Sequence, residues 1–218
     1  MIDLHTHTQF SDGLLNPAEH LRQAEVQGYT VVGITDHADA STVEIFVPAI
    51  RRFADEHNKH STTKVICGVE LTHVHPATIQ ALVKRARELG ADIVNVHGET
   101  VVEPVIPGTN KAAIEAGVDI LCHPGLISDE DAKLAASKGV RLEITSKKGH
   151  CYTNGHVYNV AKRCGNTLVY NNDAHSHNDF TSEKLARDIM AGCGIPLNEI
   201  DQIFKNSADL ADLILKRR

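Results

Sequence analysis

Two histidines followed closely by a carboxylate stand near the start of the chain. His5 and His7 follow a short apolar run, and Asp12 lies in a turn that ends at Gly13. Residues two apart on an extended strand point to the same face, so both imidazoles can reach one ion. Imidazole nitrogens beside a carboxylate oxygen are typical ligands of zinc and related metals. This segment therefore predicts one part of a metal site.

Similar side chains recur later, each close to the end of a short run of apolar, mostly β-branched residues. These further candidates are His37, Glu70, His97, His123, Asp173 and His175. Any one of them alone could be structural, because buried polar side chains usually satisfy local hydrogen bonds. Their regular position after predicted strands favours a shared metal site. Three other histidines lie among polar residues of predicted helices and are expected to face solvent, namely His20, His57 and His60.

The number of candidates exceeds what one metal ion needs. A catalytic zinc takes about three protein ligands plus water, whereas nine candidates are present here. We therefore expect two or three divalent ions that share a bridging carboxylate. Mixed imidazole and carboxylate ligands favour zinc, manganese or iron(II). Glu143 and Asp36 lie close to this set in the predicted fold, and we expect them to contact the ligands rather than the ions.

The elements that must position these side chains alternate between strands and helices. The expected strands span residues 2–4, 31–35, 64–71, 92–96, 119–122, 140–144 and 167–170. The expected helices span residues 17–27, 43–57, 76–89, 109–116, 128–138, 155–164, 182–190, 197–204 and 207–216. Nearly continuous apolar strands indicate a parallel sheet buried on both faces. Candidate groups follow every strand, which favours a closed barrel over an open sheet with one switch point.

The composition limits the fold classes and functions that this chain can have. A chain of 218 residues with 42% apolar and 4% aromatic residues predicts one domain, residues 1–218, with an aliphatic core. The net charge of −6 without a basic stripe disfavours binding to duplex nucleic acid. No segment resembles a signal peptide or a membrane span. Five cysteines without a C-x-x-C pair predict reduced thiols in a cytoplasmic protein.

Two loops at the predicted mouth carry groups that could contact a substrate. Residues 145–154 follow the sixth strand, and they contain Lys147 and Lys148 as candidate phosphate contacts and catalytic cations. In the same loop His150 is a candidate proton donor and Asn154 a candidate substrate contact, although a solvated loop of ordinary polar residues is the alternative. Other histidines could donate the proton instead or have structural roles, namely His73, His75, His156 and His177. Residues 99–111 could form a pocket wall or bind phosphate where a helix begins, with Lys111 as a contact.

Taken together, these motifs resemble a known family. They are the H-x-H-x-x-x-S-D-G start, Thr35-Asp36-His37, Gly68-x-Glu70, Val96-His97-Gly98, Cys122-His123-Pro124 and Asp173-Ala174-His175. From residue 2 to about 177 they resemble, in order, the PHP (polymerase and histidinol phosphatase) family. This resemblance implies a distorted (β/α)7 TIM-like barrel and a trinuclear metal centre that hydrolyses phosphoesters.

The resemblance also implies how the ligands divide among the ions. One ion would be held by four side chains, His5, His7, Glu70 and Asp173. A second would be held by Asp12, His37 and His175. A third would be held by His97 and His123, with Glu70 as the bridge.

The expected activity is hydrolysis of a small phosphomonoester by a metal-bridging hydroxide. The expected partner is a small phosphorylated substrate, with nucleic acid only as a short or single-stranded substrate, and the oligomeric state is left open. Within the same family, an exonuclease or nucleotide phosphodiesterase is the alternative. A structural module of the kind attached to polymerases is disfavoured, because every ligand position keeps a candidate residue. An amidohydrolase is less favoured, because that class commonly uses a carboxylated lysine after strand four, where His97 stands, and an eighth strand.

Overall fold

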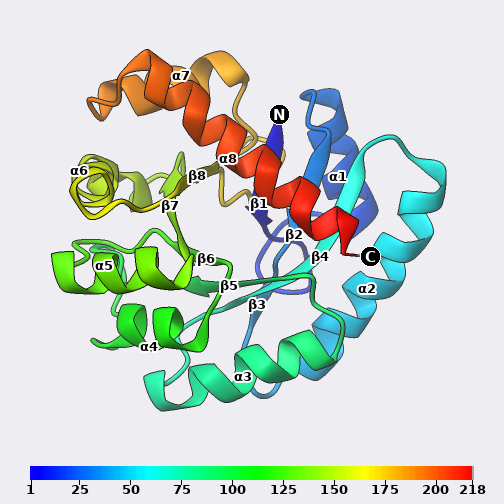
Figure 1. Cartoon of the computed structure of the whole chain (residues 1–218). Helices are drawn as coiled ribbons and strands as arrows, with labels where there is room; N and C mark the ends of the chain where they lie inside the picture. The colour runs from blue at the N-terminus through cyan, green and yellow to red at the C-terminus, as the bar shows by residue number, and fades with distance from the viewer. Residues whose placement is uncertain (218) are drawn as a thin grey trace.

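Seven parallel strands form an almost closed barrel in the computed structural model, which describes residues 1–217 (Figure 1). In barrel order they are β1 (Ile2–Thr6), β2 (Val31–Ile34), β4 (Lys64–Leu71), β5 (Ile93–His97), β6 (Ile120–Cys122), β7 (Arg141–Thr145) and β8 (Leu168–Asn171). The predicted single-domain barrel is confirmed. A two-residue strand that the sequence did not predict, β3 (His37–Ala38), pairs with the carboxyl end of β4.

Helices surround the strands, as Figure 1 shows. They are α1 (Pro17–Val26), α2 (Val43–His60), α3 (Pro76–Glu88), α4 (Thr109–Ala116), α5 (Asp129–Lys138), α6 (Asn154–Cys164), α7 (Glu183–Gly192) and α8 (Leu197–Lys216). Side-chain caps begin several of them: Asn16, Ser128 and Ser182 each accept a hydrogen bond from a first-turn backbone N–H. Within residues 1–217, no helix has the length and apolarity that crossing a membrane requires.

The two helices expected at residues 197–204 and 207–216 form one helix, α8. The expected gap, residues 205–206, lies directly before Ser207, whose side chain is of a type that competes with helical hydrogen bonds. Instead, the Ser207 hydroxyl is buried and accepts a hydrogen bond from the backbone N–H of Tyr170 in β8. This contact with the barrel satisfies the polar side chain inside the helix.

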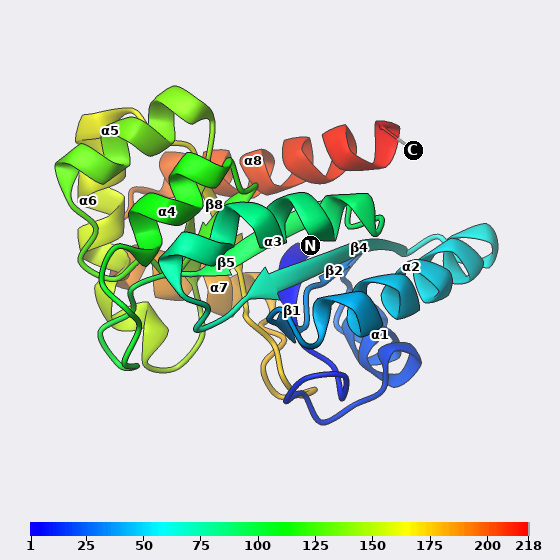
Figure 2. The same cartoon turned by 90° about the horizontal axis from the view of Figure 1, so that it is seen from below.

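Helix α8 closes one end of the barrel. Its residues Leu210, Ala211 and Ile214 pack into the apolar barrel interior. The strands contribute to this interior cluster with Leu4, Val31, Ile66, Ile93, Ile120, Cys122 and Val169. Figure 2 shows α8 on one side of the strands and the loop after β1 (blue) on the opposite side. The apolar side chains fill the amino-terminal half of the barrel and leave its carboxyl end for polar groups.

Side chains close the seam between β1 and β8. One parallel bridge joins Thr6 to Ala174, and the backbone N–H of His7 donates to the Ala174 carbonyl at 2.8 Å. Below this bridge the Asn171 amide oxygen accepts from the backbone N–H of Leu4 at 2.8 Å. The buried Asp3 carboxylate accepts from Asn172, and burial raises its pKa to about 7. Because the seam determines how β1 meets β8, it also determines how the first and last candidate ligands meet.

Candidate metal centre

An irregularity in β1 turns its histidines into the mouth of the barrel. Leu4 packs in the apolar interior, and the next residue, His5, also points inward, where its ring contacts Glu70 and Glu143. Consecutive strand residues normally face opposite sides. The pairing of β1 with β2 shifts register between Asp3 and Thr6, as a β-bulge does. Because of this shift, β1 contributes Leu4 to the apolar amino-terminal end of the barrel, called the base below, and its histidines to the carboxyl end, called the mouth.

The buried carboxylate of Glu70 lies at the centre of the cluster. Oε1 lies 3.3 Å from His5 Nε2 and 3.6 Å from His97 Nδ1. Oε2 lies 2.7 Å from His37 Nδ1 and 3.7 Å from His7 Nε2. Burial alone would raise the pKa of Glu70, but His5 and His37 outweigh it and hold the pKa well below its usual range. A charged carboxylate between several imidazoles is suited to bridge two cations.

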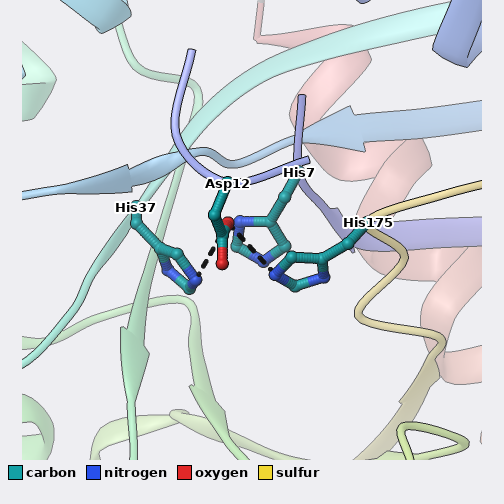
Figure 3. A group of neighbouring side chains, drawn as sticks. All are labelled: His7, Asp12, His37 and His175. Atoms are coloured by element: carbon teal, nitrogen blue, oxygen red, sulfur yellow. Dashed lines mark ion pairs between the residues drawn. The ribbon is translucent and has the colours of Figure 1, made fainter. Parts of the chain in front are cut away.

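The nine predicted ligands meet at this mouth in overlapping groups whose ligand atoms lie within 4.8 Å of one another. One group comprises His5, His7 and Asp173, and another comprises Glu70, His97 and His123. The third group comprises His7, Asp12, His37 and His175, drawn in Figure 3. The structure therefore brings the nine predicted ligands to one mouth, but its groups differ from the expected division: Glu70 is absent from the group of His5, His7 and Asp173, and His7 also belongs to the group of Asp12.

In the group of Figure 3, the Asp12 carboxylate stands between two imidazoles. Asp12 Oδ1 lies 3.4 Å from His37 Nε2 and 3.2 Å from His175 Nε2. Asp36 fixes the approach of this segment, because its carboxylate accepts hydrogen bonds from the backbone N–H groups of Thr8 and Ser11. Asp36 thus supports the turn that carries Asp12.

Backbone strain accompanies the placement of two candidate ligands. His123 has a φ of 27° and Asp173 a φ of 54°, values that non-glycine residues rarely adopt. Such conformations cost about 1–3 kcal/mol each and persist where the surrounding structure imposes them, often at functional sites. Here His123 comes directly after β6 and Asp173 two residues after the end of β8, and both side chains point into the mouth.

Several buried atoms of the mouth have no hydrogen-bond partner within residues 1–217. They are His5 Nε2, His7 Nδ1, His7 Nε2, Glu70 Oε1 and Asp173 Oδ1. His97 Nε2 also makes no hydrogen bond of good geometry, but it lies 3.1 Å from Glu103 Oε2. Buried polar atoms are nearly always paired, so a cluster of such atoms indicates a site for a ligand. Their chemistry fits divalent zinc, manganese or iron, which accept mixed imidazole and carboxylate ligands.

The other ring nitrogens of two candidate ligands are held by Glu143, as the sequence predicted for a supporting carboxylate. Glu143 Oε1 lies 2.8 Å from His5 Nδ1, and Oε2 lies 3.0 Å from His123 Nδ1. Asn171 donates a further hydrogen bond to Glu143 at 2.9 Å. A carboxylate on the far side of a metal-binding imidazole fixes the tautomer and the ring orientation. Glu143 thereby leaves Nε2 of both histidines directed into the mouth.

Burial and nearby charges shift the pKa values of these histidines in opposite directions. Burial alone would lower the pKa of His37, but Glu70 and Asp12 outweigh it and raise the pKa to about 10. Burial is the main cause that lowers the pKa of His123 to about 4. Because an imidazole must release its proton to bind a metal, ion binding at His37 would displace a proton.

A pocket of about 330 Å³ opens above the cluster. Its lining residues are Asp12, His37, Thr72, His73, His97, Glu103, Lys147, His150, Asp173 and His175. Of the candidate substrate groups, Lys147 and His150 line it. Lys147 Nζ donates to the backbone carbonyl of Asp173 at 3.0 Å and lies 2.6 Å from His175 Nδ1. The pocket thus combines candidate ligands with one lysine.

The remaining candidate substrate groups lie outside this lining. Lys111 and Lys148 are exposed. Asn154 is buried, and its side-chain amide bonds to both the N–H and the carbonyl of Thr145, at the end of β7. Their roles as substrate contacts stay predictions, although the Asn154 amide is already engaged in positioning the loop.

The start of α4 does not offer the phosphate site that the sequence suggested. Glu99 Oε1 accepts hydrogen bonds from the backbone N–H groups of Gly108 and Asn110, each at 2.9 Å. A carboxylate of the chain therefore already occupies the position that a phosphate would take. The loop instead contributes Glu103 to the pocket wall, as the sequence also allowed.

Two residues, His20 and Glu103, lie where the sequence did not predict them. His20 was expected on a solvated helix face but is fully buried, with its ring 4.9 Å from that of Phe180. Glu103 was not selected as a site residue, yet its carboxylate meets three histidines of the pocket. The only available signal was its position in a loop that follows a candidate strand end.

Comparison with known proteins decides the family. The model of the PHP domain matches residues 3–214. The chain belongs to the PHP domain family. An uncharacterized protein from Methanocaldococcus jannaschii is 43% identical over 201 residues, covering 91% of this chain and 92% of that protein. The DNA polymerase/3′-5′ exonuclease PolX of Bacillus subtilis is 25% identical over 193 residues, which cover 80% of this chain and 34% of PolX.

Solved structures share the barrel of this PHP domain. A histidinol phosphate phosphatase from Lactococcus lactis, complexed with zinc, L-histidinol and phosphate, matches with a TM-score of 0.61 and 16% identity. That match covers 89% of this chain and 94% of the phosphatase. An amidohydrolase matches with a TM-score of 0.63 and 15% identity, over 97% of this chain and 74% of its own. At these identities the likeness shows the fold alone.

Proposed function

We propose that this PHP domain is a metal-dependent phosphoesterase that hydrolyses a small phosphomonoester. The observation that carries the proposal is the cluster of unpartnered imidazole and carboxylate atoms around Glu70, at the floor of a pocket of about 330 Å³. Three overlapping ligand groups support a centre of two or three divalent ions. Multinuclear sites of this kind suit displacement at phosphorus.

The ions and the side chains would divide the chemistry between them. When bound, divalent ions would lower the pKa of an attacking water and neutralise charge on the phosphate oxygens. Lys147, which lines the pocket, adds a positive charge where a phosphate oxygen would bind. His150 lines the same pocket, with Nε2 3.9 Å from Asp173 Oδ2, and could donate a proton to the leaving oxygen.

A neighbouring depression offers room for the organic part of the substrate. It measures about 370 Å³ and shares His37 and Thr72 with the main pocket. The rings of Phe10 and Phe46, with centroids 5.7 Å apart, form part of its wall together with Asp39. Neither lysine nor arginine is among the residues that line it. This lining favours an uncharged or cationic group over a second phosphate, and it supports a small monoester.

Two observations favour other activities. A nucleotide phosphodiesterase or exonuclease is favoured by the similarity to PolX, but the single lysine of the main pocket offers no track for a polyanion. An amidohydrolase is favoured by the shared barrel. Against it, the strand that would supply a carboxylated lysine, β5, ends in His97.

The test is a hydrolysis panel on protein loaded with zinc, manganese or iron(II). It compares a chromogenic phosphomonoester, the corresponding phosphodiester and an N-acyl amino acid, with metal content measured on the same samples. We expect metal-dependent cleavage of the monoester above that of the diester, and no cleavage of the amide. Preferential diester or amide cleavage by metal-loaded protein would contradict the proposal.

A further inference from the structure

Glu103 joins three histidines that come from three different segments. Its Oε2 lies 3.0 Å from His73 Nε2 and 3.1 Å from His97 Nε2, and its Oε1 lies 3.4 Å from His150 Nε2. His97 ends β5, His73 follows β4, and His150 follows β7. None of the three ligand groups described above includes Glu103. Glu103 therefore lies beside these three groups and contacts one of their members, His97.

The two nitrogens of His97 face different partners. Nδ1 lies 3.6 Å from Glu70 Oε1 and 3.1 Å from His123 Nε2, on the side of the candidate ion site. Nε2 points the other way and lies 3.1 Å from Glu103 Oε2. A neutral imidazole that binds an ion through Nδ1 must carry its proton on Nε2, and this proton needs an acceptor because the His97 side chain is only 3% exposed. Glu103 is the carboxylate in position to accept it.

The same loop, residues 99–108, also holds His150 at both ring nitrogens. Thr100 Oγ1 lies 2.9 Å from Nδ1, while Glu103 faces Nε2. The ring of His150 stacks on that of His123, with centroids 4.1 Å apart. The loop thus orients a pocket histidine directly beside the ligand group of Glu70, His97 and His123.

Contacts at both ends fix the path of this loop. The Glu99 side chain accepts from the backbone at Gly108 and Asn110, as described above, and the Glu99 N–H donates to the Asn110 side chain at 2.9 Å. The Glu99 carbonyl packs so closely on Gly125, which has a φ of 61°, that a Cβ there would lie 1.8 Å from the oxygen. These contacts hold the backbone of the loop on both sides of Glu103, so the fold determines where its carboxylate lies.

We propose that Glu103 is a positioning residue that selects the Nε2-protonated form of His97 and thereby controls occupancy of the ion site formed by Glu70, His97 and His123. It would leave the other two ligand groups unaffected, because it contacts none of their members. The inference rests on the metal centre of the proposed function, but it does not depend on which substrate is hydrolysed.

The test titrates metal-free protein with Mn²⁺ and counts the bound ions by calorimetry and elemental analysis. The variants are Glu103→Ala, which removes the acceptor, and Glu103→Gln, which keeps a neutral one. The matched control is Glu115→Gln, an exposed carboxylate on α4. We expect Glu103→Ala to weaken one binding event about 10–100-fold while the others keep their affinity. Glu103→Gln should have a smaller effect, and the control should equal the wild type.

A second readout follows the tautomer itself. In ¹⁵N NMR of the metal-free protein, at a pH above the His97 pKa of about 9, the neutral His97 ring should carry its proton on Nε2 in the wild type and lose that preference in Glu103→Ala. Unchanged Mn²⁺ affinities in Glu103→Ala, or an unchanged His97 tautomer, would overturn the inference. Both readouts are independent of hydrolysis. An inactive wild type with the expected metal effect would therefore contradict the proposed function while leaving this inference intact.

Discussion

The two ends of the barrel are built from the same strands, but one end buries aliphatic side chains and the other buries polar ones. At the base, Ile66, Ile93 and Ile120 pack against α8 in an apolar interior. At the mouth, the same strands β4, β5 and β6 lead into Glu70, His97 and His123, which are equally buried. Burial of aliphatic groups stabilises the fold by about 25 cal/mol per Å². Burial of unpaired polar groups destabilises it.

This contrast indicates that the mouth is maintained at a cost in stability when no ligand is bound. It contains the strained backbone of His123 and Asp173 and the unpartnered atoms of the candidate ligands. The base consists mainly of packed aliphatic side chains, which carry no polar atoms to satisfy. A ligand that binds only the folded state returns stability by mass action. Substitutions should therefore separate the two ends, affecting activity at one and stability at the other.

The largest effect is expected for Asp173→Asn and His97→Ala, each of which removes a candidate metal ligand from the mouth. Each should reduce metal-dependent phosphoester hydrolysis by about a thousandfold or more, because several kcal/mol of charge stabilisation are lost. Metal-free Asp173→Asn should remain as stable as the wild type, since burial raises the pKa of Asp173 and thus disfavours its charged form. Asparagine also tolerates a positive φ. Steady-state kinetics and urea unfolding measure both quantities, and full activity in either variant would remove that residue from the mechanism.

The matching change at the base is Ile120→Ala in β6, three residues before His123. It should lower the free energy of unfolding by about 2–5 kcal/mol, because it opens a cavity in a fully buried cluster. The number of bound ions, measured by elemental analysis below the unfolding transition, should not change. Loss of an ion in this variant would show that the two ends are not separable.

A smaller effect is expected for Glu143→Gln, which keeps the shape of the side chain but removes its charge. Glu143 contacts His5 and His123 through their outer nitrogens, so the variant should weaken metal affinity about 10–100-fold without removing a ligand. Competition with a metal-binding dye measures this affinity. An unchanged affinity would indicate that the orientation of both rings is set by backbone packing alone.

The smallest effect is expected on the pH dependence of stability, through His20, a buried histidine of α1 that packs on Phe180. Burial lowers its folded-state pKa to about 4 from a usual value of 6.5. Between these values the unfolded chain binds more protons, so this histidine makes stability fall as pH drops from about 6.5 towards 4. Replacing it in His20→Leu should reduce that slope by about 1 kcal/mol per pH unit. Urea unfolding between pH 4.5 and 7 measures it, and an unchanged slope would show that His20 does not titrate with folding.

Sequence reasoning located the nine candidate ligands because each stands close to the end of an apolar strand. Parallel strands place their carboxyl ends at one edge of a barrel, so this regularity alone predicts proximity. It did not locate Glu103, which lies in an irregular loop whose path depends on contacts of Glu99 with α4. It also misjudged His20, because polar neighbours in sequence did not reveal that its side chain packs against Phe180.

By itself, the sequence determined the order of strands and helices, the barrel class and the chemical types available at its mouth. Only the tertiary structure decided which nitrogen meets which oxygen. Asp12 and His175 are far apart in the chain, and their 3.2 Å approach depends on the β1 irregularity and on the β1–β8 seam. The physical reason is that strand periodicity fixes the face of a side chain, whereas ligand distances of a few ångströms require the closed barrel to fix register and backbone direction.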